Sequence, residues 1–241
     1  MEKLHTEEFD DQLKLMIPHL NNYPELLPFI GKKWNEYKTK TLIIAESHYI
    51  DEGAISDAHI NDWYNYKAED FLWKDYLDSI NTRHNVDLAD NVEIHGYKSP
   101  YLHYYNMKKE IKTNISKLKD VDLVYPYFSY YNYFQRPALS DGASITNNTK
   151  DDEIAYNTFK QLINIIKPNN AIFVSNKSYN SFMYRRNELN EQNLFSINIY
   201  SVPHPGCAWW NKKSSKYGMK IGTNINRTGR ERFIDIITSK I

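Results

Sequence analysis

The stretch Thr-Leu-Ile-Ile-Ala-Glu-Ser-His-Tyr, residues 41–49, decides the fold predicted for this chain. Its first five residues are apolar on both faces, which is typical of a strand buried inside a parallel sheet. A second segment, Ile-Asn-Ile-Tyr-Ser-Val-Pro-His-Pro-Gly at residues 197–206, also passes from a strand pattern into a polar loop. Open α/β sheets bind ligands beyond the carboxyl ends of their strands, so we expect Glu46, His48 and His204 at a reactive site.

Strand and helix patterns alternate along the rest of the chain. Strands are predicted at residues 41–45, 122–128, 171–175 and 196–202, and helices at 7–16, 24–30, 70–80, 106–118, 151–166, 179–190 and 228–239. This alternation predicts an α/β fold: a three-layer αβα sandwich around a four-stranded, mainly parallel sheet in the order 2-1-3-4. No repeat or linker interrupts the pattern, so residues 1–241 are expected to form a single domain.

The composition is that of an ordinary globular protein, with 41% hydrophobic and 25% charged residues among 241. The lone cysteine, Cys207, cannot form an internal disulfide, and the sequence opens without a charged and then apolar leader. We therefore expect the protein in the reducing cytoplasm. We also expect it to be a monomer. No apolar run approaches the roughly 20 residues that a membrane helix needs, so no membrane partner is predicted.

Charge is unevenly distributed along the chain although the formal net charge is zero. Residues 176–241 hold 11 Lys and Arg against 4 Asp and Glu, which leaves 19 against 26 for residues 1–175. The basic part includes the Pro-His-Pro-Gly loop, so a positive face beside one candidate site would suit a nucleic-acid partner. The alternative is a solvated basic helix and loop without a ligand.

The polar residues after the first strand have alternative interpretations. Glu46 at the end of a buried strand would be partly desolvated, which suits a base or an electrostatic stabiliser, or it could tie down the following helix. His48 could be a base, an orienting residue or a histidine satisfied within the core. The segment has no glycines with which to approach a phosphate, and the dinucleotide fingerprint is absent.

Other reactive centres find less support in the sequence. Five histidines are available to a metal, at positions 48, 59, 95, 103 and 204, but none has the spacing of a zinc-binding helix, and one cysteine cannot form a thiolate site. We therefore predict neither a metal nor a cofactor. A Cys207 nucleophile beside His204, or an esterase-like hydrolase that uses His48 or His204, remain alternatives.

The combination of three loops resembles the uracil-DNA glycosylase superfamily. These loops are Leu-Ile-Ile-Ala-Glu-Ser-His-Tyr, Tyr-Tyr-Asn-Tyr-Phe-Gln-Arg-Pro and Val-Pro-His-Pro-Gly, and they span residues 40–211. The chain is most similar to bacterial members whose motifs read Gly-Glu-Ser-His-Tyr and Tyr-Asn-Phe-x-Gln. The resemblance implies a monofunctional DNA glycosylase that flips its target base out of the DNA and needs no cofactor.

The resemblance also implies roles for individual residues. Glu46 matches a first-motif position that in some branches bears a Glu near the attacking water, and Ser47 falls where the best-known branch has its water-activating Asp. Tyr49 aligns with the tyrosine that crowds carbon 5 of the pyrimidine, and Asn132 with the asparagine that reads the base edge. His204 matches the histidine that stabilises the departing base anion.

The chemistry of the residue types agrees with this resemblance. Hydrolysis of an N-glycosidic bond passes through an oxocarbenium-like sugar, which a carboxylate such as Glu46 can stabilise while a neutral His204 helps the base to leave. A flipped base needs aromatic neighbours, for which Tyr49, Trp63 and Tyr64 are candidates. Each of these aromatic residues could equally belong to the core or to the general surface.

A DNA-binding segment is predicted directly after the histidine loop. Trp209 and Trp210 precede Lys212, Lys213 and Lys216, and together they could supply an apolar wedge and phosphate contacts. In the alternative interpretation, one of the two tryptophans packs under the last helix.

The excised base is expected to be a modified pyrimidine, such as the hypermodified cytosine of phage DNA, in a phage-defence role. Ser47 replaces the Asp that a general repair enzyme would keep, and tyrosine-rich insertions at residues 63–76, 97–105 and 125–134 could surround a large base. Against this, Tyr49 stands where the uracil-specific branch excludes 5-substituents. The alternatives are a uracil-DNA repair glycosylase and a catalytically inactive nucleic-acid-binding module of the same fold.

Overall fold

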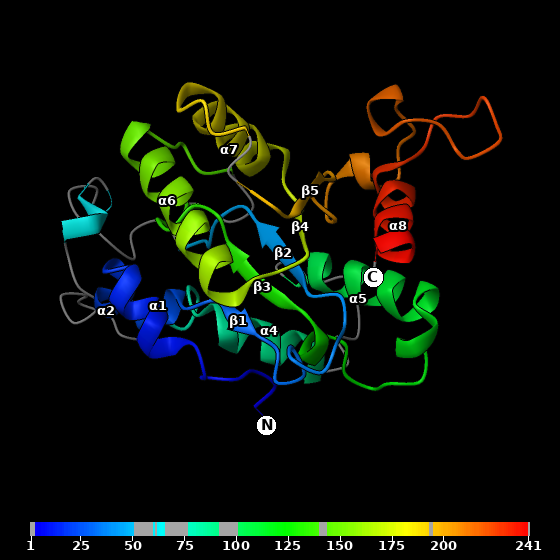
Figure 1. Cartoon of the computed structure of the whole chain (residues 1–241). Coiled ribbons are helices and arrows are strands. Elements are labelled where there is room, and N and C mark those ends of the chain that lie inside the picture. Colours follow the sequence, from blue (N-terminus) through cyan, green and yellow to red (C-terminus); the bar gives the residue numbers. More distant parts are fainter. Residues whose placement is uncertain are drawn as a thin grey trace.

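A computed structural model describes residues 3–50, 60, 62–65, 77–91, 101–139, 144–192 and 195–240 of the chain. It has the α/β architecture that the sequence predicts, with a mixed sheet in the centre (Figure 1). The strands of the described residues are β1 (Phe29–Ile30), β2 (Thr41–Ala45), β3 (Ser129–Asn132), β4 (Asn170–Phe173) and β5 (Asn198–Ser201).

The sheet has the strand order β1-β3-β2-β4-β5. Strands β3, β2, β4 and β5 are parallel, and β1 pairs antiparallel with β3 at one edge. The four predicted strands thus occur in the predicted relative order, but the sheet is five-stranded and mixed rather than four-stranded. The chain runs from central β2 to β3 on one side and then crosses to β4 on the other, which creates a switch point beside β2.

Helices cover both faces of the sheet (Figure 1). One layer contains α1 (Asp10–Met16), α2 (His19–Asn22), α6 (Thr149–Ile166) and α7 (Asn176–Glu188), and the other contains α4 (Thr82–Asn91), α5 (Leu102–Asn114) and α8 (Gly229–Lys240). Capping chemistry sets the limits of the longest helix. Asn148 and Asp151 form a capping box at the start of α6, and Lys167 ends it in a left-handed conformation ahead of Pro168.

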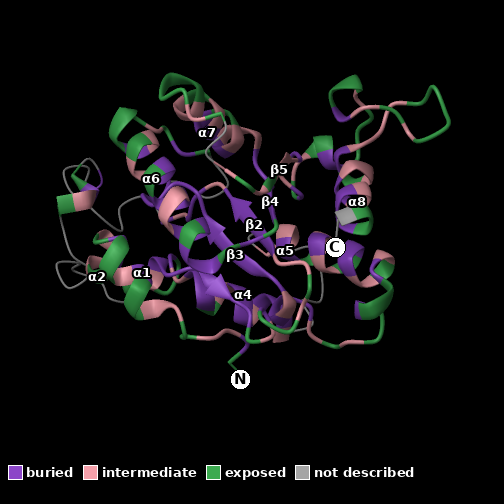
Figure 2. Cartoon of the chain, viewed as in Figure 1, coloured by how far each residue is buried: buried purple, intermediate pink, exposed green. Residues whose placement is uncertain are grey.

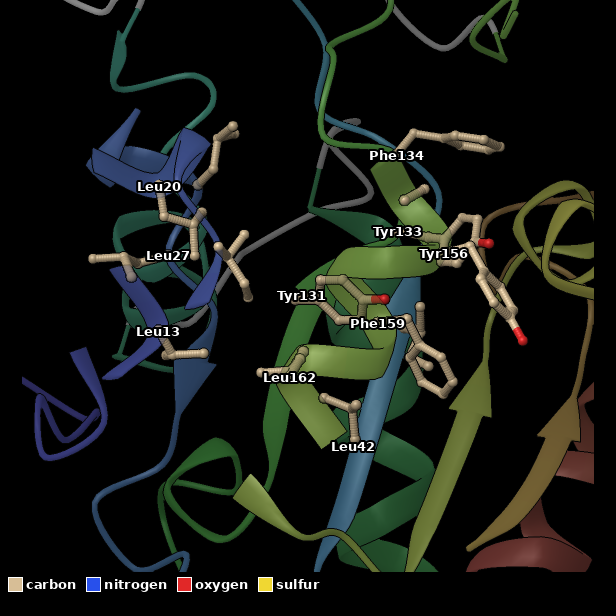
Figure 3. Packing of buried hydrophobic residues seen from close by; sticks show 14 of the residues in the cluster. Leu13, Leu20, Leu27, Leu42, Tyr131, Tyr133, Phe134, Tyr156, Phe159 and Leu162 are labelled. Carbon is tan, nitrogen blue, oxygen red and sulfur yellow. The ribbon is translucent and has the colours of Figure 1, made fainter. Parts of the chain in front are cut away.

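Two apolar clusters fill the spaces between the sheet and the helix layers. Successive residues of β2 alternate between them, with Leu42 and Ile44 facing α6 and Ile43 and Ala45 facing α5. The first cluster is rich in aromatic residues, and Tyr131, Tyr133, Tyr156 and Phe159 are among its fully buried members (Figure 3). Burial of β2 on both faces explains its uninterrupted apolar sequence, and Figure 2 shows the central strands as buried.

The structure corrects two predicted elements. Residues 24–30 form a short 3-10 turn, Pro24–Leu26, followed by β1 rather than a helix, because Pro28 favours an extended conformation at Leu27. The strand predicted at residues 122–128 begins only at Ser129, after the 3-10 turn Tyr125–Tyr127 that Pro126 initiates. The helix predicted at residues 70–80 lies largely outside the described residues. Among those described, no helix is both long and apolar enough to cross a bilayer.

Candidate active site

The carboxyl ends of all four parallel strands meet at one edge of the sheet. In the strand register, Ala45 pairs with Asn132, Ile44 with Phe173, and Phe173 with Ser201. The residues that follow each strand therefore emerge side by side, and they include Glu46 after β2, Ser175 after β4 and His204 after β5. This register brings together polar groups that lie far apart in the sequence.

Glu46 is anchored at this edge through both its backbone and its side chain. Its carbonyl accepts a hydrogen bond from Phe134 N at 2.9 Å, and its Oε2 accepts one from Ser175 Oγ at 2.7 Å. Ser175 is also the N-cap of α7, where Oγ accepts from the backbone N–H groups of Lys177 and Ser178. One hydroxyl therefore fixes the carboxylate and begins the neighbouring helix.

Two polar atoms of the first loop are buried without a hydrogen-bond partner among the described residues. They are Oε1 of Glu46 and Oγ of Ser47. A buried polar atom normally forms a hydrogen bond to protein, water or ligand. Each of these two atoms can therefore form a hydrogen bond with a polar group that enters the site. Glu46 as a residue is partly exposed, whereas its Oε1 atom is buried.

His48 and Asn132 form a buried pair below the site. Nε2 of His48 lies 2.9 Å from Nδ2 of Asn132 and 2.9 Å from Oγ1 of Thr82 on α4. Burial lowers the pKa of His48 to about 3, so the ring is neutral at physiological pH. His48 is therefore placed to orient the Asn132 amide rather than to contact a ligand.

The loop that carries His204 is supported by two helices. Pro203 and Pro205 flank the histidine and restrict its backbone, and Asn106 of α5 donates from Nδ2 to the Pro205 carbonyl at 2.8 Å. Helix α8 approaches from the other side at Gly229, where a Cβ atom would lie 2.1 Å from Cγ of Pro203. Only a glycine fits this contact, so the start of α8 fixes the loop position.

The hydrogen bonding of His204 defines which ring nitrogen carries the proton. The backbone N–H of Gly206 donates to Nδ1 at 3.2 Å, so the neutral ring carries its proton on Nε2. Burial lowers the pKa of His204, and the nearby Glu46 carboxylate opposes this by raising it. The result is a neutral imidazole that can donate a hydrogen bond from Nε2. It lies close enough to Glu46 for that carboxylate to raise its pKa.

Aromatic side chains from α5 and β3 form a wall beside His204. The ring of His103 lies 5.1 Å from that of His204 and 3.9 Å from that of Tyr104, centroid to centroid. Its Nε2 lies 3.3 Å from the hydroxyl of Tyr130. Tyr49 is partly buried and interacts electrostatically with Tyr104 and Tyr130, so its side chain belongs to the same region.

Two of the aromatic residues predicted to stack on a base have other partners. Trp63 is fully buried and stacks on Tyr23 with ring centroids 4.2 Å apart, so the prediction that it contacts a ligand is corrected. The Tyr64 hydroxyl donates to Asp151 at 3.0 Å, and burial raises its pKa. No described contact joins Tyr64 to Glu46 or His204.

The predicted DNA-binding segment divides into a buried and an exposed part. Trp210 is 2% exposed and packs on Phe233 of α8 with ring centroids 5.5 Å apart, which corrects its predicted DNA contact and confirms the alternative. Trp209 is 52% exposed, and the Lys212 ammonium lies over its ring at 5.7 Å from the centroid. Lys212, Lys213 and Lys216 are all exposed, as phosphate contacts require.

The tyrosine-rich insertions predicted to surround a base lie only partly within the described residues. Residues 125–134 are almost entirely buried and form the turn before β3, the strand itself and its continuation, so most of the segment belongs to the core. Tyr130 of this segment contacts His103 beside His204. Residues 66–76 and 97–100 lie outside the described part of the chain, as do His59 and His95. Within the described ranges, no group of three or more His, Cys, Asp or Glu residues is arranged to hold a metal ion.

Three site residues were not identified from sequence patterns. Ser175 directly follows the predicted third strand, so the rule that pointed to Glu46 and His204 could also have found it. Thr82 and His103 lie on helices, and no local signal relates them to the strand ends.

No protein-family model matches this sequence, and no curated protein matches it significantly. The assignment of a function to the site therefore depends on the geometry described above.

Proposed function

We propose that the protein is a DNA glycosylase with a uracil-DNA glycosylase-like fold, which hydrolyses the N-glycosidic bond of a flipped-out pyrimidine. The observation that carries the proposal is the proximity of a carboxylate, Glu46, to a neutral histidine donor, His204. Both groups lie at the switch-point edge of a parallel sheet, where α/β proteins bind ligands.

The two groups suit the two halves of an N-glycosidic transition state. The bond between C1′ and the base nitrogen breaks with its electron pair moving to the base, while water oxygen bonds to C1′ and releases a proton. Glu46 stabilises the positive sugar and orients or deprotonates the water. Its Oε1 and the Ser47 hydroxyl have no other hydrogen-bond partner among the described residues and can bind that water. His204 Nε2–H donates to the base oxygen on which negative charge develops.

Base recognition is assigned to Asn132 in this proposal. The side-chain NH2 group of Asn132 donates a hydrogen bond to Nε2 of His48. This leaves the amide oxygen of Asn132 to accept from the Watson–Crick edge of a base. The aromatic wall of His103, Tyr104 and Tyr130 lies beside His204, and Tyr49 completes it. The target is a modified pyrimidine, such as hypermodified cytosine in phage DNA, and the protein acts as a cytoplasmic monomer in phage defence.

A second candidate is a nucleic-acid-binding module of the same fold without catalytic activity. The buried Ser47 hydroxyl favours it, because a serine without an adjacent base cannot deprotonate water as an aspartate can. The choice between the candidates depends on whether Glu46 can serve as the missing base.

Abasic-site formation tests the proposal. Uracil-containing DNA, and phage DNA with hydroxymethylated or glucosylated cytosine, are incubated with the protein and then cleaved with alkali. We expect strand breaks in the modified DNA, none with Glu46→Gln, and unchanged breaks with the exposed control Glu36→Gln. Release of uracil alone would favour a repair glycosylase, and tight DNA binding without breaks in any substrate would favour the inactive module.

A further inference from the structure

A cavity of about 390 Å³ lies at the start of α4. Three segments line it: residues 3–7 near the N-terminus, the 3-10 turn Pro24–Leu26, and the first turn of α4 with the residue before it. Its volume is within the range of small-molecule sites, roughly 300–1,000 Å³. None of the residues assigned above to the candidate active site is among the described residues that line it. The cavity is therefore a separate place where a ligand could bind.

The permanent cations that line the cavity already have anionic partners. Arg83 forms a bidentate ion pair with Asp10 and donates from Nε to the Pro28 carbonyl at 3.0 Å. Lys3 pairs with Glu7. An anionic ligand would have to displace one of these carboxylates, so the lining does not favour an anion.

Glu25 is a lining carboxylate that lacks a cation. It forms no ion pair with any described residue, and its Oε2 is buried without a hydrogen-bond partner. Burial raises the pKa of Glu25, and the nearby carboxylate of Asp78 raises it further. A bound cation would stabilise the ionised form of both groups. Because no hydrogen bond holds Oε2, that atom can turn toward a ligand without losing one.

The charge around the cavity indicates the class of ligand. Five carboxylates oppose two permanent cations there: the carboxylates are Glu7, Asp10, Glu25, Asp78 and Asp87, and the cations are Lys3 and Arg83. A metal ion is a poor match, since the described residues contain no group of three His, Cys, Asp or Glu arranged to hold one. An organic cation that carries more than one positive charge fits both the surplus of negative charge and the volume.

We propose that this cavity binds a linear polyamine, with one ammonium group on the carboxylate of Glu25. Ammonium groups donate charge-assisted hydrogen bonds to carboxylates, and the methylene groups between them can pack along an apolar side chain such as Pro24, which also lines the cavity. The proposal does not depend on the glycosylase function, because no residue of the cavity takes part in that reaction.

Helix α4 connects the cavity to the candidate active site. Asn81 caps the helix, with its Oδ1 accepting from the backbone N–H of His84 at 3.0 Å, and both residues line the cavity. Between them in the sequence, Thr82 contacts His48, which in turn orients the Asn132 amide. A ligand in the cavity therefore stabilises the helix start that positions His48.

Calorimetric titration of the full chain with spermidine, without DNA and at physiological ionic strength, tests the proposal. We expect saturable binding of spermidine and none of triethylene glycol, a neutral chain of similar length. Glu25→Gln should lower the affinity about tenfold, because a hydrogen bond to a charged group is lost. Glu36→Gln is the matched control, since Glu36 is exposed and does not line the cavity, and its affinity should equal that of the natural chain.

A second variant guards against a folding defect in Glu25→Gln. Asp78 is exposed, so Asp78→Asn should leave the fold intact while lowering the affinity for spermidine about threefold, as for the loss of one exposed charge partner. Circular dichroism of both variants verifies that they are folded.

Histidine ring signals in NMR spectra locate the ligand. His5 and His84 line the cavity, so their signals should shift with spermidine while that of His204 stays unchanged. The signal of His48 should also shift, through its contact with Thr82. A His48 signal that stays unchanged while His5 and His84 shift would overturn the connection through α4.

The remaining outcomes separate this inference from the proposed function. Absence of spermidine binding, or equal affinity in the natural chain, Glu25→Gln and Asp78→Asn, would overturn the polyamine site. Shifts confined to His204 would place the amine at the candidate active site and overturn it as well, as would tighter binding of Mg²⁺ or inorganic phosphate than of spermidine. Spermidine binding that depends on Glu25, together with no abasic sites in any DNA, would uphold the cavity site and reject only the glycosylase.

Discussion

The backbone N–H of Gly206 donates to Nδ1 of His204 at 3.2 Å, and a Cβ atom on Gly206 would lie 3.2 Å from the same ring. This contact fixes the tautomer of the histidine and brings the chain close against one side of it. A neutral imidazole with its proton on Nε2 can donate a hydrogen bond from that nitrogen to a developing anion. The loop conformation therefore prepares His204 for its proposed role.

The electrostatic link between His204 and Glu46 can be measured directly. The carboxylate raises the pKa of His204, so Glu46→Gln should lower that pKa further. Imidazole nitrogen NMR shifts across a pH titration report both the pKa and the Nε2–H tautomer. A pKa that stays unchanged or rises in the variant would mean that the two side chains do not interact in solution.

Ser175 is predicted to affect both stability and catalysis. Ser175→Ala removes the N-cap of α7, which should cost about 1 kcal/mol of the free energy of unfolding. It also removes the hydrogen bond to Glu46, which should reduce kcat by about tenfold because bonds to charged groups are worth more than about 1.5 kcal/mol. Ser175→Thr keeps the hydroxyl and should restore both. Loss of stability with unchanged kcat would limit Ser175 to its capping role.

His48 should make the fold sensitive to acid. Its pKa is about 3 in the folded chain, against about 6.5 for a solvated histidine in the unfolded chain. Below about pH 6.5 the unfolded state therefore binds a proton that the folded state does not. Stability falls as the pH falls, by about 2 kcal/mol between pH 7 and pH 5 from this group alone.

Urea denaturation of His48→Gln at these two pH values measures that contribution. The variant should lose about 2 kcal/mol less than the natural chain on going from pH 7 to pH 5. His84→Gln is the matched control, because His84 is exposed on the same helix that supplies Thr82. An identical loss in the natural chain and in His48→Gln would show that His48 is accessible to protons in the folded state.

The adjacent tryptophans should behave in opposite ways. Trp210→Ala opens a cavity against Phe233 and should reduce the free energy of unfolding by about 3–5 kcal/mol. Trp209→Ala removes an exposed ring and should change that free energy by less than about 0.5 kcal/mol, while weakening DNA binding. Thermal denaturation and anisotropy measure the two effects, and equal destabilisation by both changes would contradict the structure.

The sequence predicted the sheet well where burial leaves an unambiguous pattern. Strands β2 and β4 are apolar throughout because helices cover both faces, and their parallel pairing follows from the helices between them. Strand β1 was missed because it has two residues, too few for any periodicity, and its existence depends on pairing with β3. Tertiary contacts, rather than local propensity, create it.

The candidate site was predictable only where its residues follow strands. Glu46, Asn132 and His204 lie at strand ends, a position that the topology makes common to all three. His103 and Thr82 reach the site from helices whose rotation and docking no local pattern encodes. The same limitation explains why the predicted ligand contacts of Trp63 and Trp210 were wrong. Spacing along the chain does not distinguish a buried tryptophan from an exposed one.

The most direct test of the account is abasic-site formation in phage DNA that contains hydroxymethylated or glucosylated cytosine. The natural chain should produce alkali-labile sites, and His204→Ala should form them about 10²–10³ times more slowly, as for the loss of one donor to a developing anion. Strand breaks that are equally frequent with the natural chain, with His204→Ala and with Glu46→Gln would contradict the central claim that these two residues perform the reaction.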